Sequence, residues 1–293
     1  MAAFGLVAGS VGVACSLLLD TSGNQCTTTQ DCVNRGDAFA GLQCVNSVCG
    51  SPVDAGPWGC LGDVVVPQST NVTVNVIVPL IDLATQMPVT SATALVCAKI
   101  DVNCTSPLAT TQPDASGLLH LTLQAGFDGF VLVLPILPDA GAPDAGDGGE
   151  PDVIVPSIVF FNPPIERDLT YTTIVLVKTS ALAQIAAVEK TTLDPTLGAV
   201  FMETVDCNGQ PAPGVSVSLD STGATTQGFY FSGGLPVLNG AGTDVSGFAG
   251  FVNAPLGTRT VKATLNATQQ YIGTASVFTL ASMISYTTLA PSP

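Results

Sequence analysis

The stretch that decides the fold is DCNGQPAPGVSVSL at residues 206–219, together with TDVSGFAGFVNAPLGTRTVKATL at residues 243–265. Alternating valines in the first piece predict a half-buried strand, and the second piece places two more strands after a turn. The turn contains Asp244, Ser246 and Gly247. Asp and Ser side chains bond the turn backbone and Gly allows a positive φ, so these three residues favour a tight reversal.

The same pattern occurs earlier in the chain, in LATQMPVTSATALV at 83–96 and QPDASGLLHLTLQAGFDGFVLVL at 112–134. A proline again precedes a strand, and Asp114, Ser116 and Gly117 again form a turn before the following strands. Short strands at regular, turn-bounded spacing are typical of a β-sandwich. We interpret the two stretches as an internal repeat, with one sandwich in each copy.

The repeated pattern resembles the carboxypeptidase regulatory-like and transthyretin-like family of β-sandwich domains, more closely over 198–265 than over 72–134. The resemblance implies an all-β fold with two Ig-like or transthyretin-like sandwiches. It implies no peptidase activity, because the sequence contains no HxxE motif. The whole layout is similar to that of bacterial surface lipoproteins of unknown function.

Changes in composition predict the domain organisation. We expect a signal or lipoprotein anchor segment at 1–19, a disulfide-rich segment at 20–60, a first β-sandwich region at 61–177 that contains an acidic Pro/Asp/Gly loop at 138–152, a helical connection at 178–195 and a second β-sandwich at 196–293. The acidic loop has no branched apolar residue, so we expect a linker that is dispensable for folding. One short helix is predicted near 180–190, with Thr179 or Ser180 as its cap.

The segment GLVAGSVGVACSLLLD at 5–20 runs small apolar residues into Cys15. It resembles a bacterial lipoprotein signal, in which the cysteine after the cleavage site carries lipid, and Ala14 fits the small position before it. No basic residue precedes Arg35, so we expect Met1 to lie inside a longer natural signal. An ordinary cleaved signal and a structural helix are the alternative interpretations.

The chain contains nine cysteines and no CxxC, which indicates an oxidising compartment. Lipidation of Cys15 would leave eight cysteines, an even number that can pair completely in disulfides. Cys26, Cys32, Cys44 and Cys49 allow three connectivities, of which we favour Cys26–Cys44 with Cys32–Cys49. Zinc is the competing interpretation, and it is disfavoured because close pairs of ligands are absent.

Cys97 and Cys104 flank a loop short enough to close, so we expect them to pair. Cys60 and Cys207 then remain, and a bond between them would hold both β regions as one rigid body. The alternative is that Cys60 pairs with Cys97 or Cys104 and leaves Cys207 free.

The charge and the residue types exclude several classes of function. The chain has seven basic and 22 acidic residues, and the resulting net charge of −15 repels nucleic acid. The single histidine, His120, alternates with apolar residues and is interpreted as a strand-face residue. Glu203 and Asp206 lie three apart on a predicted strand and so face opposite sides, which disfavours a glycosidase pair.

We therefore predict a non-enzymatic, exported cell-surface or outer-membrane protein with a structural or partner-binding role. We expect no catalytic residues, no metal and no cofactor. Its expected partners are the membrane, through the lipid anchor, and an envelope or extracellular protein or glycan. The alternative is an accessory carbohydrate- or peptide-binding protein of a secreted degradative system. The oligomeric state is left open.

Overall fold

The computed structural model describes residues 25–36, 39, 42–45, 47–50, 56–62, 64, 72–137, 152–237 and 240–292. The chain forms two compact units, Met1–Gly59 and Cys60–Pro293. The predicted anchor segment with Cys15 lies outside the described residues, as does all of the acidic loop except Asp152.

The first unit contains helix α1 (Thr29–Val33) and a hairpin of β1 (Gln43–Val45) and β2 (Val48–Gly50). A capping box begins the helix: the Thr28 hydroxyl accepts from the Asp31 N–H, and the Asp31 carboxylate accepts from the Thr28 N–H. Backbone N–H groups of Thr27 and Thr28 lower the pKa of Asp31 to about 2. The helix start is therefore fixed by local hydrogen bonds.

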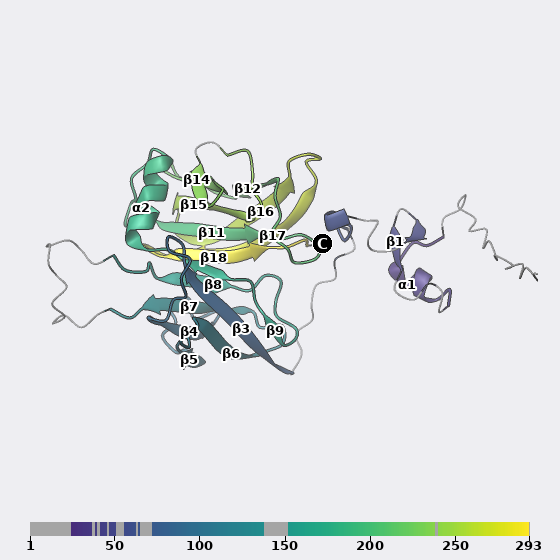
Figure 1. Ribbon diagram of the computed structural model, residues 1–293, viewed down its shortest axis with the longest axis horizontal. Coiled ribbons are helices and arrows are strands. Elements are labelled where there is room, and N and C mark those ends of the chain that lie inside the picture. Colours follow the sequence, from purple (N-terminus) through teal and green to yellow (C-terminus); the bar gives the residue numbers. More distant parts are fainter. Residues whose placement is uncertain are drawn as a thin grey trace, which may run out of the picture. The chain divides into compact units, whose positions relative to one another are not determined.

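In the part of the second unit that the structure describes, the secondary structure is almost entirely β with one short helix, which confirms the predicted fold class (Figure 1). Its elements are β3 (Thr73–Asp82), β4 (Ala92–Ala98), β5 (Ala109–Thr111), β6 (Leu118–Gln124), β7 (Gly129–Pro135), β8 (Ser157–Phe160), β9 (Leu169–Thr170), β10 (Ile174–Leu176), α2 (Thr179–Val188), β11 (Gly198–Thr204), β12 (Val215–Leu219), β13 (Gln227–Ser232), β14 (Leu235–Val237), β15 (Phe248–Ala254), β16 (Gly257–Leu265), β17 (Tyr271–Thr279) and β18 (Ile284–Leu289).

The two repeats share one strand topology. In the first repeat, β3 lies between antiparallel β6 and parallel β10, and β7 lies between antiparallel β4 and β8. In the second repeat, β11 lies between antiparallel β15 and parallel β18, and β16 lies between antiparallel β12 and β17. Each repeat is therefore a β-sandwich, built from the same sequence of strand pairings.

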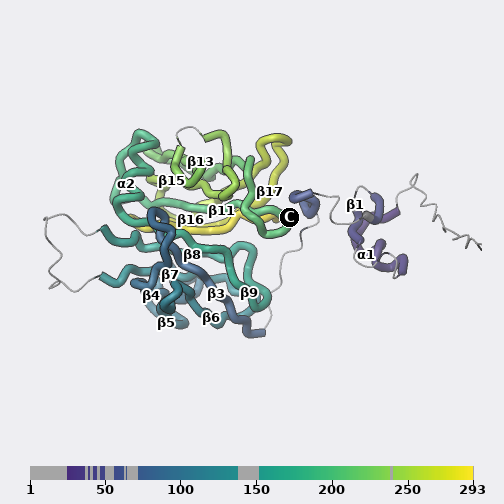
Figure 2. Tube along the Cα trace, in the orientation of Figure 1, coloured from purple at the N-terminus to yellow at the C-terminus, as the bar shows by residue number. Residues whose placement is uncertain are grey.

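A parallel pair between β18 and β8 joins the two sandwiches, with Ile284 opposite Ser157 and Thr287 opposite Phe160. It produces one nine-stranded sheet in the order β14-β13-β15-β11-β18-β8-β7-β4-β5 (Figures 1 and 2). The other strands form a four-stranded sheet, in which β9 also pairs with β3, and a three-stranded sheet. The repeats thus share a sheet, a feature that the sequence analysis does not predict.

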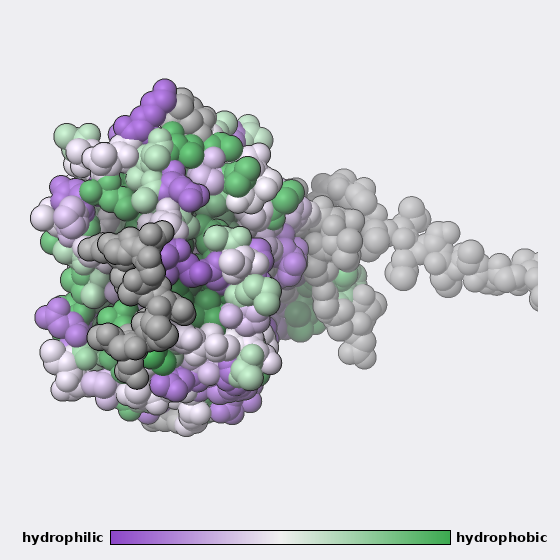
Figure 3. All heavy atoms as spheres, turned by 60° about the vertical axis from the view of Figure 1, so that its left-hand side comes forward, coloured by the Kyte–Doolittle hydropathy of each residue, from purple (hydrophilic) through white to green (hydrophobic). Residues whose placement is uncertain are grey.

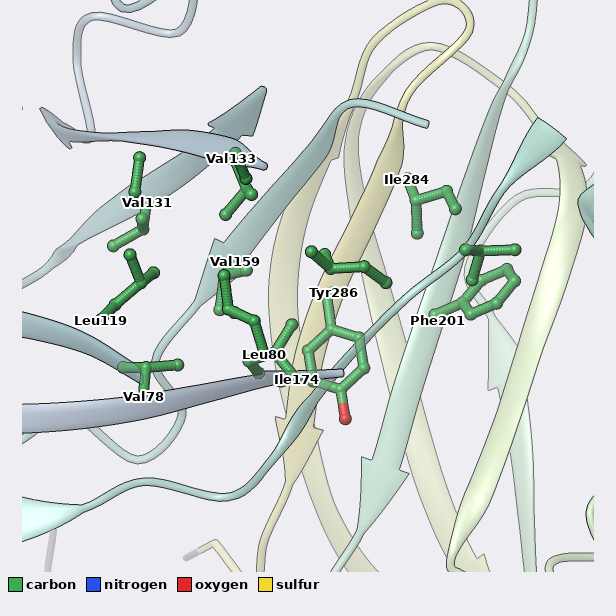
Figure 4. Packing of buried hydrophobic residues seen from close by; sticks show 14 of the residues in the cluster. Val78, Leu80, Leu119, Val131, Val133, Val159, Ile174, Phe201, Ile284 and Tyr286 are labelled. Atoms are coloured by element: carbon green, nitrogen blue, oxygen red, sulfur yellow. The ribbon is translucent and has the colours of Figure 1, made fainter. Parts of the chain in front are cut away.

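Both faces of the shared sheet are buried at its central strands β11, β18 and β8. On one face, a single hydrophobic cluster contains Leu80 of the first repeat with Phe201 and Tyr286 of the second (Figure 4). On the other face, the Phe278 ring of β17 lies 4.9 Å from that of Phe130 and 5.0 Å from that of Phe160. All seven residues of β11 are buried for this reason.

Candidate functional site

The N-terminus of helix α2 contacts Asp152, the last residue of the predicted acidic loop. The Asp152 carboxylate accepts from the Ser180 N–H at 2.9 Å and from the Thr179 hydroxyl at 3.1 Å. The N-cap residue is Lys178, whose side chain makes no capping bond, so the expected cap at Thr179 or Ser180 is wrong. The cap comes instead from a residue 28 positions earlier, and the Ser180 N–H is the main cause of the lowered pKa of Asp152. Asp152 therefore has a structural role, although it falls within the predicted linker.

The buried side of α2 carries Leu182, Ile185 and Ala186, the residues that the sequence pattern places on its apolar face. Leu182 also contributes to a pocket of about 580 Å³ next to the starts of β8, β11 and β18. Figure 3 turns the side of the molecule that carries α2 forward and shows hydrophobic and hydrophilic residues interspersed on it. The pocket is lined by Pro135, Val153, Ile154, Val155, Pro156, Thr179, Leu182, Leu193, Asp194, Pro195, Leu197, Gly198, Ala199, Asn253, Ser282 and Met283.

Polar side chains in the pocket wall are already engaged within the protein. Asn253 is 2% exposed, and its amide donates to Thr192 O at 2.8 Å and accepts from the Asp194 N–H at 2.9 Å. The Ser282 hydroxyl donates to Pro195 O at 2.9 Å. Carbon atoms are thus the main surface offered to a ligand, which suits an apolar group.

Sequence reasoning missed Asn253, which lies at the end of a strand pattern and adopts a positive φ of 54°. Asn tolerates this conformation better than most residues. The sequence feature that could have identified this residue is its position two residues before Pro255.

The turn residues of the first repeat lie together as a compact reversal. Asp114 Oδ1 accepts from the Ser116 N–H at 2.8 Å, and Gly117 has a φ of 76°. A Cβ added to Gly117 would lie 2.8 Å from Pro88 Cβ. The second carboxylate oxygen of Asp114 lies 3.1 Å from Nε2 of His120, on the exposed side of β6.

The turn of the second repeat has the same construction. Asp244 Oδ1 accepts from the Ser246 N–H at 2.9 Å and from its hydroxyl at 2.6 Å, and Gly247 has a φ of 68°. A Cβ on Gly247 would lie 2.5 Å from Thr204 O and 3.3 Å from Pro211 Cα. In each repeat the turn glycine therefore packs closely against the proline that precedes a strand, so the motif serves the fold.

Eight cysteines form four disulfides in the structure: Cys26–Cys44, Cys32–Cys49, Cys60–Cys207 and Cys97–Cys104. These are the pairs favoured from parity and spacing. The first two join helix α1 and the segment before it to the hairpin of the first unit. The Cys60–Cys207 bond, with Cα atoms 5.8 Å apart, fastens the start of the second unit to the turn after β11.

The sulfur atoms of Cys26, Cys32 and Cys49 lie within 4.8 Å of one another. The two disulfides of the first unit lie side by side, which explains this proximity. A metal binds the free thiolate, and these sulfurs are bonded in pairs. The cluster is therefore a disulfide core.

A buried polar cluster lies where the two repeats meet. Glu203 is 5% exposed, and its Oε2 accepts from the hydroxyl of Thr172. The Tyr171 hydroxyl lies 3.0 Å from the Thr288 hydroxyl, and burial raises the pKa of Tyr171 to about 12. The Tyr286 hydroxyl is buried and has no hydrogen-bond partner among the described residues.

The carboxylates of Glu203 and Asp206 have different surroundings. Burial raises the pKa of Glu203. Asp206 lies in a turn, where its Oδ1 accepts from the Asn208 N–H at 2.8 Å and the Gln210 N–H at 3.0 Å. The two groups therefore serve the core and a turn, and the geometry gives no support to a catalytic pair.

Glu203→Gln is expected to stabilise the protein at pH 8 and to have little effect near pH 4. The raised pKa means that the folded state holds the proton more tightly than the unfolded state, so ionisation of Glu203 costs stability as the pH rises. A gain of about 1 kcal/mol corresponds to roughly 2–4 °C in melting temperature for a unit of this size. Thermal unfolding at both pH values measures it, and an equal shift at pH 4 and pH 8 would contradict this explanation.

Among the described residues, no helix has the length and apolar character needed to cross a membrane.

No family model matches the chain, and no curated protein matches it. Similar solved structures include the Bacillus anthracis TIE protein, at 14% identity over 75% of this chain and 34% of that one, with a TM-score of 0.22. They also include the shaft pilin SpaA from Lactobacillus rhamnosus GG (12% identity, 76% and 99% coverage, TM-score 0.23) and GBS52, the minor pilin of Streptococcus agalactiae (13%, 75% and 98%, TM-score 0.20). This chain spans about a third of the TIE protein. TM-scores this low carry no functional argument.

Proposed function

We propose that this chain is an exported, non-enzymatic cell-surface protein with a structural or partner-binding role. The observation that carries the proposal is the nine-stranded sheet, which runs through both sandwiches. Separate domains on a linker move independently by default, whereas a shared sheet with a shared core holds both repeats in one orientation. A rigid body of this kind suits a protein that spaces or presents surfaces.

The disulfides support export. Four bonds hold eight cysteines, and disulfides of this number persist mainly in oxidising compartments. The first unit has few residues with which to build a core, so its two disulfides supply much of its stability.

A lipid anchor at Cys15 is part of the proposal, and it rests on the sequence of residues 5–20. Several acyl chains on the N-terminal cysteine would hold the protein on a membrane more firmly than a single acyl chain can. The rest of the chain, with its net charge of −15, would remain in the aqueous phase.

Cys15→Ala is expected to move the protein from the membrane fraction to the soluble exported fraction. Acyl attachment requires the cysteine thiol, and the four disulfides do not use this residue. Fractionation, combined with mass spectrometry of the mature N-terminus, measures the change. Ser16→Ala is the matched control and should leave the distribution unchanged. Retention of the Cys15→Ala protein in the membrane fraction would rule out the anchor.

The second candidate function is binding of a peptide or carbohydrate for a secreted degradative system. The pocket beside α2 favours a peptide, because its wall is mainly apolar and its amide and hydroxyl groups are already hydrogen-bonded. Carbohydrate would leave hydroxyl groups unpaired there. Parallel peptide and glycan arrays separate the two ligands, and a pull-down from envelope extracts tests the structural role.

A further inference from the structure

The outer edge of β6 is an open strand edge. β6 lies at one end of the β10-β3-β6 sheet, and its residues pair with β3 in regular register from Leu118 opposite Pro79 to Gln124 opposite Thr73 (Figure 1). In the part of the chain that the structure describes, no strand pairs with the other side of β6. On this side Leu118 already bonds to Asp114, and Gln124 O accepts from the Phe127 N–H. The groups available to another strand are therefore the backbone groups of His120 and Thr122 and the N–H of Gln124.

The hydrogen-bond pattern between β3 and β6 shows which backbone groups of β6 point outward. The Leu80 N–H donates to Gly117 O at 2.8 Å, so every second residue from Leu119 onward bonds to β3 and turns its side chain into the core. The alternate residues present their backbone N–H groups outward and have exposed side chains: His120, Thr122 and Gln124.

Two other sheet edges, those of β14 and β12, are blocked. β14 contains Pro236, which has no N–H to donate. On β12, the N–H groups of Val215 and Val217 already donate to the hydroxyls of Thr243 and Tyr230, at 3.1 and 3.0 Å. The β6 sequence LLHLTLQ contains no Pro, no Lys and no bulge, which are usual devices that protect an edge.

The second repeat shows what fits this position. There β15 takes the place of β6, and β13 covers its outer edge in antiparallel pairing, with Phe229 opposite Gly250. In the first repeat, the segment between β4 and β6 forms β5, which pairs with β4 in the other sheet. The same fold thus accommodates an antiparallel strand at this edge in the second repeat and leaves the edge open in the first repeat.

We propose that the β6 edge binds the β6 edge of a second copy of this chain, in antiparallel pairing around a two-fold axis at Thr122. In this register Thr122 lies opposite Thr122 of the second copy, and His120 lies opposite Gln124. Such an isologous contact is complementary to itself. Cross-strand Thr pairs are favourable in antiparallel sheets.

The side chains of β6 itself carry no charge that would repel a second copy at this edge. The chain has a net charge of −15, which opposes association through most of its surface. The exposed side chains of β6 include no carboxylate and no Lys, and His120 already has Asp114 as its neighbour at 3.1 Å. The side chains of β6 therefore bring no like charges together when two copies approach along this edge.

The experiment compares the full chain with Thr122→Asp by sedimentation from about 1 µM to 1 mM, because one strand pair buries less area than a standard interface and should associate weakly. Two Asp residues would face each other across the axis, and we expect the dimer dissociation constant to rise at least about tenfold. Ser276→Asp adds the same charge at an exposed position of β17 and is the matched control, with an unchanged constant expected.

Hydrogen exchange on the unmodified chain supplies a second measurement that does not depend on the variant folding. The amides of His120, Thr122 and Gln124 should exchange more slowly at high concentration than at low concentration. A monomer at 1 mM, a dimer without protection at these amides, or equal effects of Thr122→Asp and Ser276→Asp would each overturn the proposal. None of these results tests whether the shared sheet holds the two repeats of one chain in one orientation.

Discussion

Replacing Cys60 and Cys207 together by Ala is expected to lower the free energy of unfolding of the second unit by about 4–5 kcal/mol. The bond closes a loop with a sequence separation of 147. In the chain-entropy model a loop of this length restricts the unfolded chain far more than a short one. For a unit of this size, the loss corresponds to a fall of roughly 8–20 °C in melting temperature.

The matched control is the double replacement of Cys97 and Cys104, whose sequence separation is only 7. The same model gives about 2–3 kcal/mol for that loop, so the two double variants should differ by about 2 kcal/mol. Denaturant titration of both variants measures the difference. Equal losses would show that loop length does not set the stabilisation here.

Phe201→Ala is expected to cost about 3–5 kcal/mol and to weaken both repeats at once. Phe201 is 1% exposed, and its ring lies 5.0 Å from that of Phe229. It belongs to the cluster that also contains residues of the first repeat, including Val78 and Leu80 (Figure 4). The cavity left by the ring therefore lies in a core that the two repeats share.

Hydrogen exchange read separately on β7 and β15 tests whether the loss is shared. One transition with faster exchange in both strands is the expected result. Phe201→Leu, which keeps most of the volume, should cost less than about 1.5 kcal/mol. Faster exchange confined to β15 would show that the repeats unfold independently and would contradict the rigid-body proposal.

Local features of this fold could be predicted from the sequence. The turns at Asp114 and Asp244 depend on residues two or three positions apart, and the structure places these side chains as such turns require. The apolar face of α2 follows from helical periodicity. Both signals lie within a few residues of the structure that they determine.

Apart from the Cys60–Cys207 bond, which the parity of the cysteines indicates, long-range features could not be predicted. The cap of α2 comes from Asp152, and nothing in the sequence near Ser180 identifies that partner. The pairing of β18 with β8 depends on a register between strands far apart in the chain. Every residue of β11 is buried, so the strand shows no alternation of buried and exposed positions. Its two covered faces therefore could not be predicted from such a pattern. The pocket beside α2 results from these distant contacts and was missed with them.

The position of β18 also determines the order in which the molecule can be completed. β18 is the fifth of nine strands in the shared sheet, yet it begins at Ile284, long after β8 ends at Phe160. When the chain emerges from a ribosome or an export channel, the first repeat appears with the β8 edge unpaired. Such edges promote aggregation, and contacts between distant residues form slowly. The delay between the emergence of Phe160 and that of Leu289 therefore sets how long a nascent chain of this protein needs protection from its neighbours.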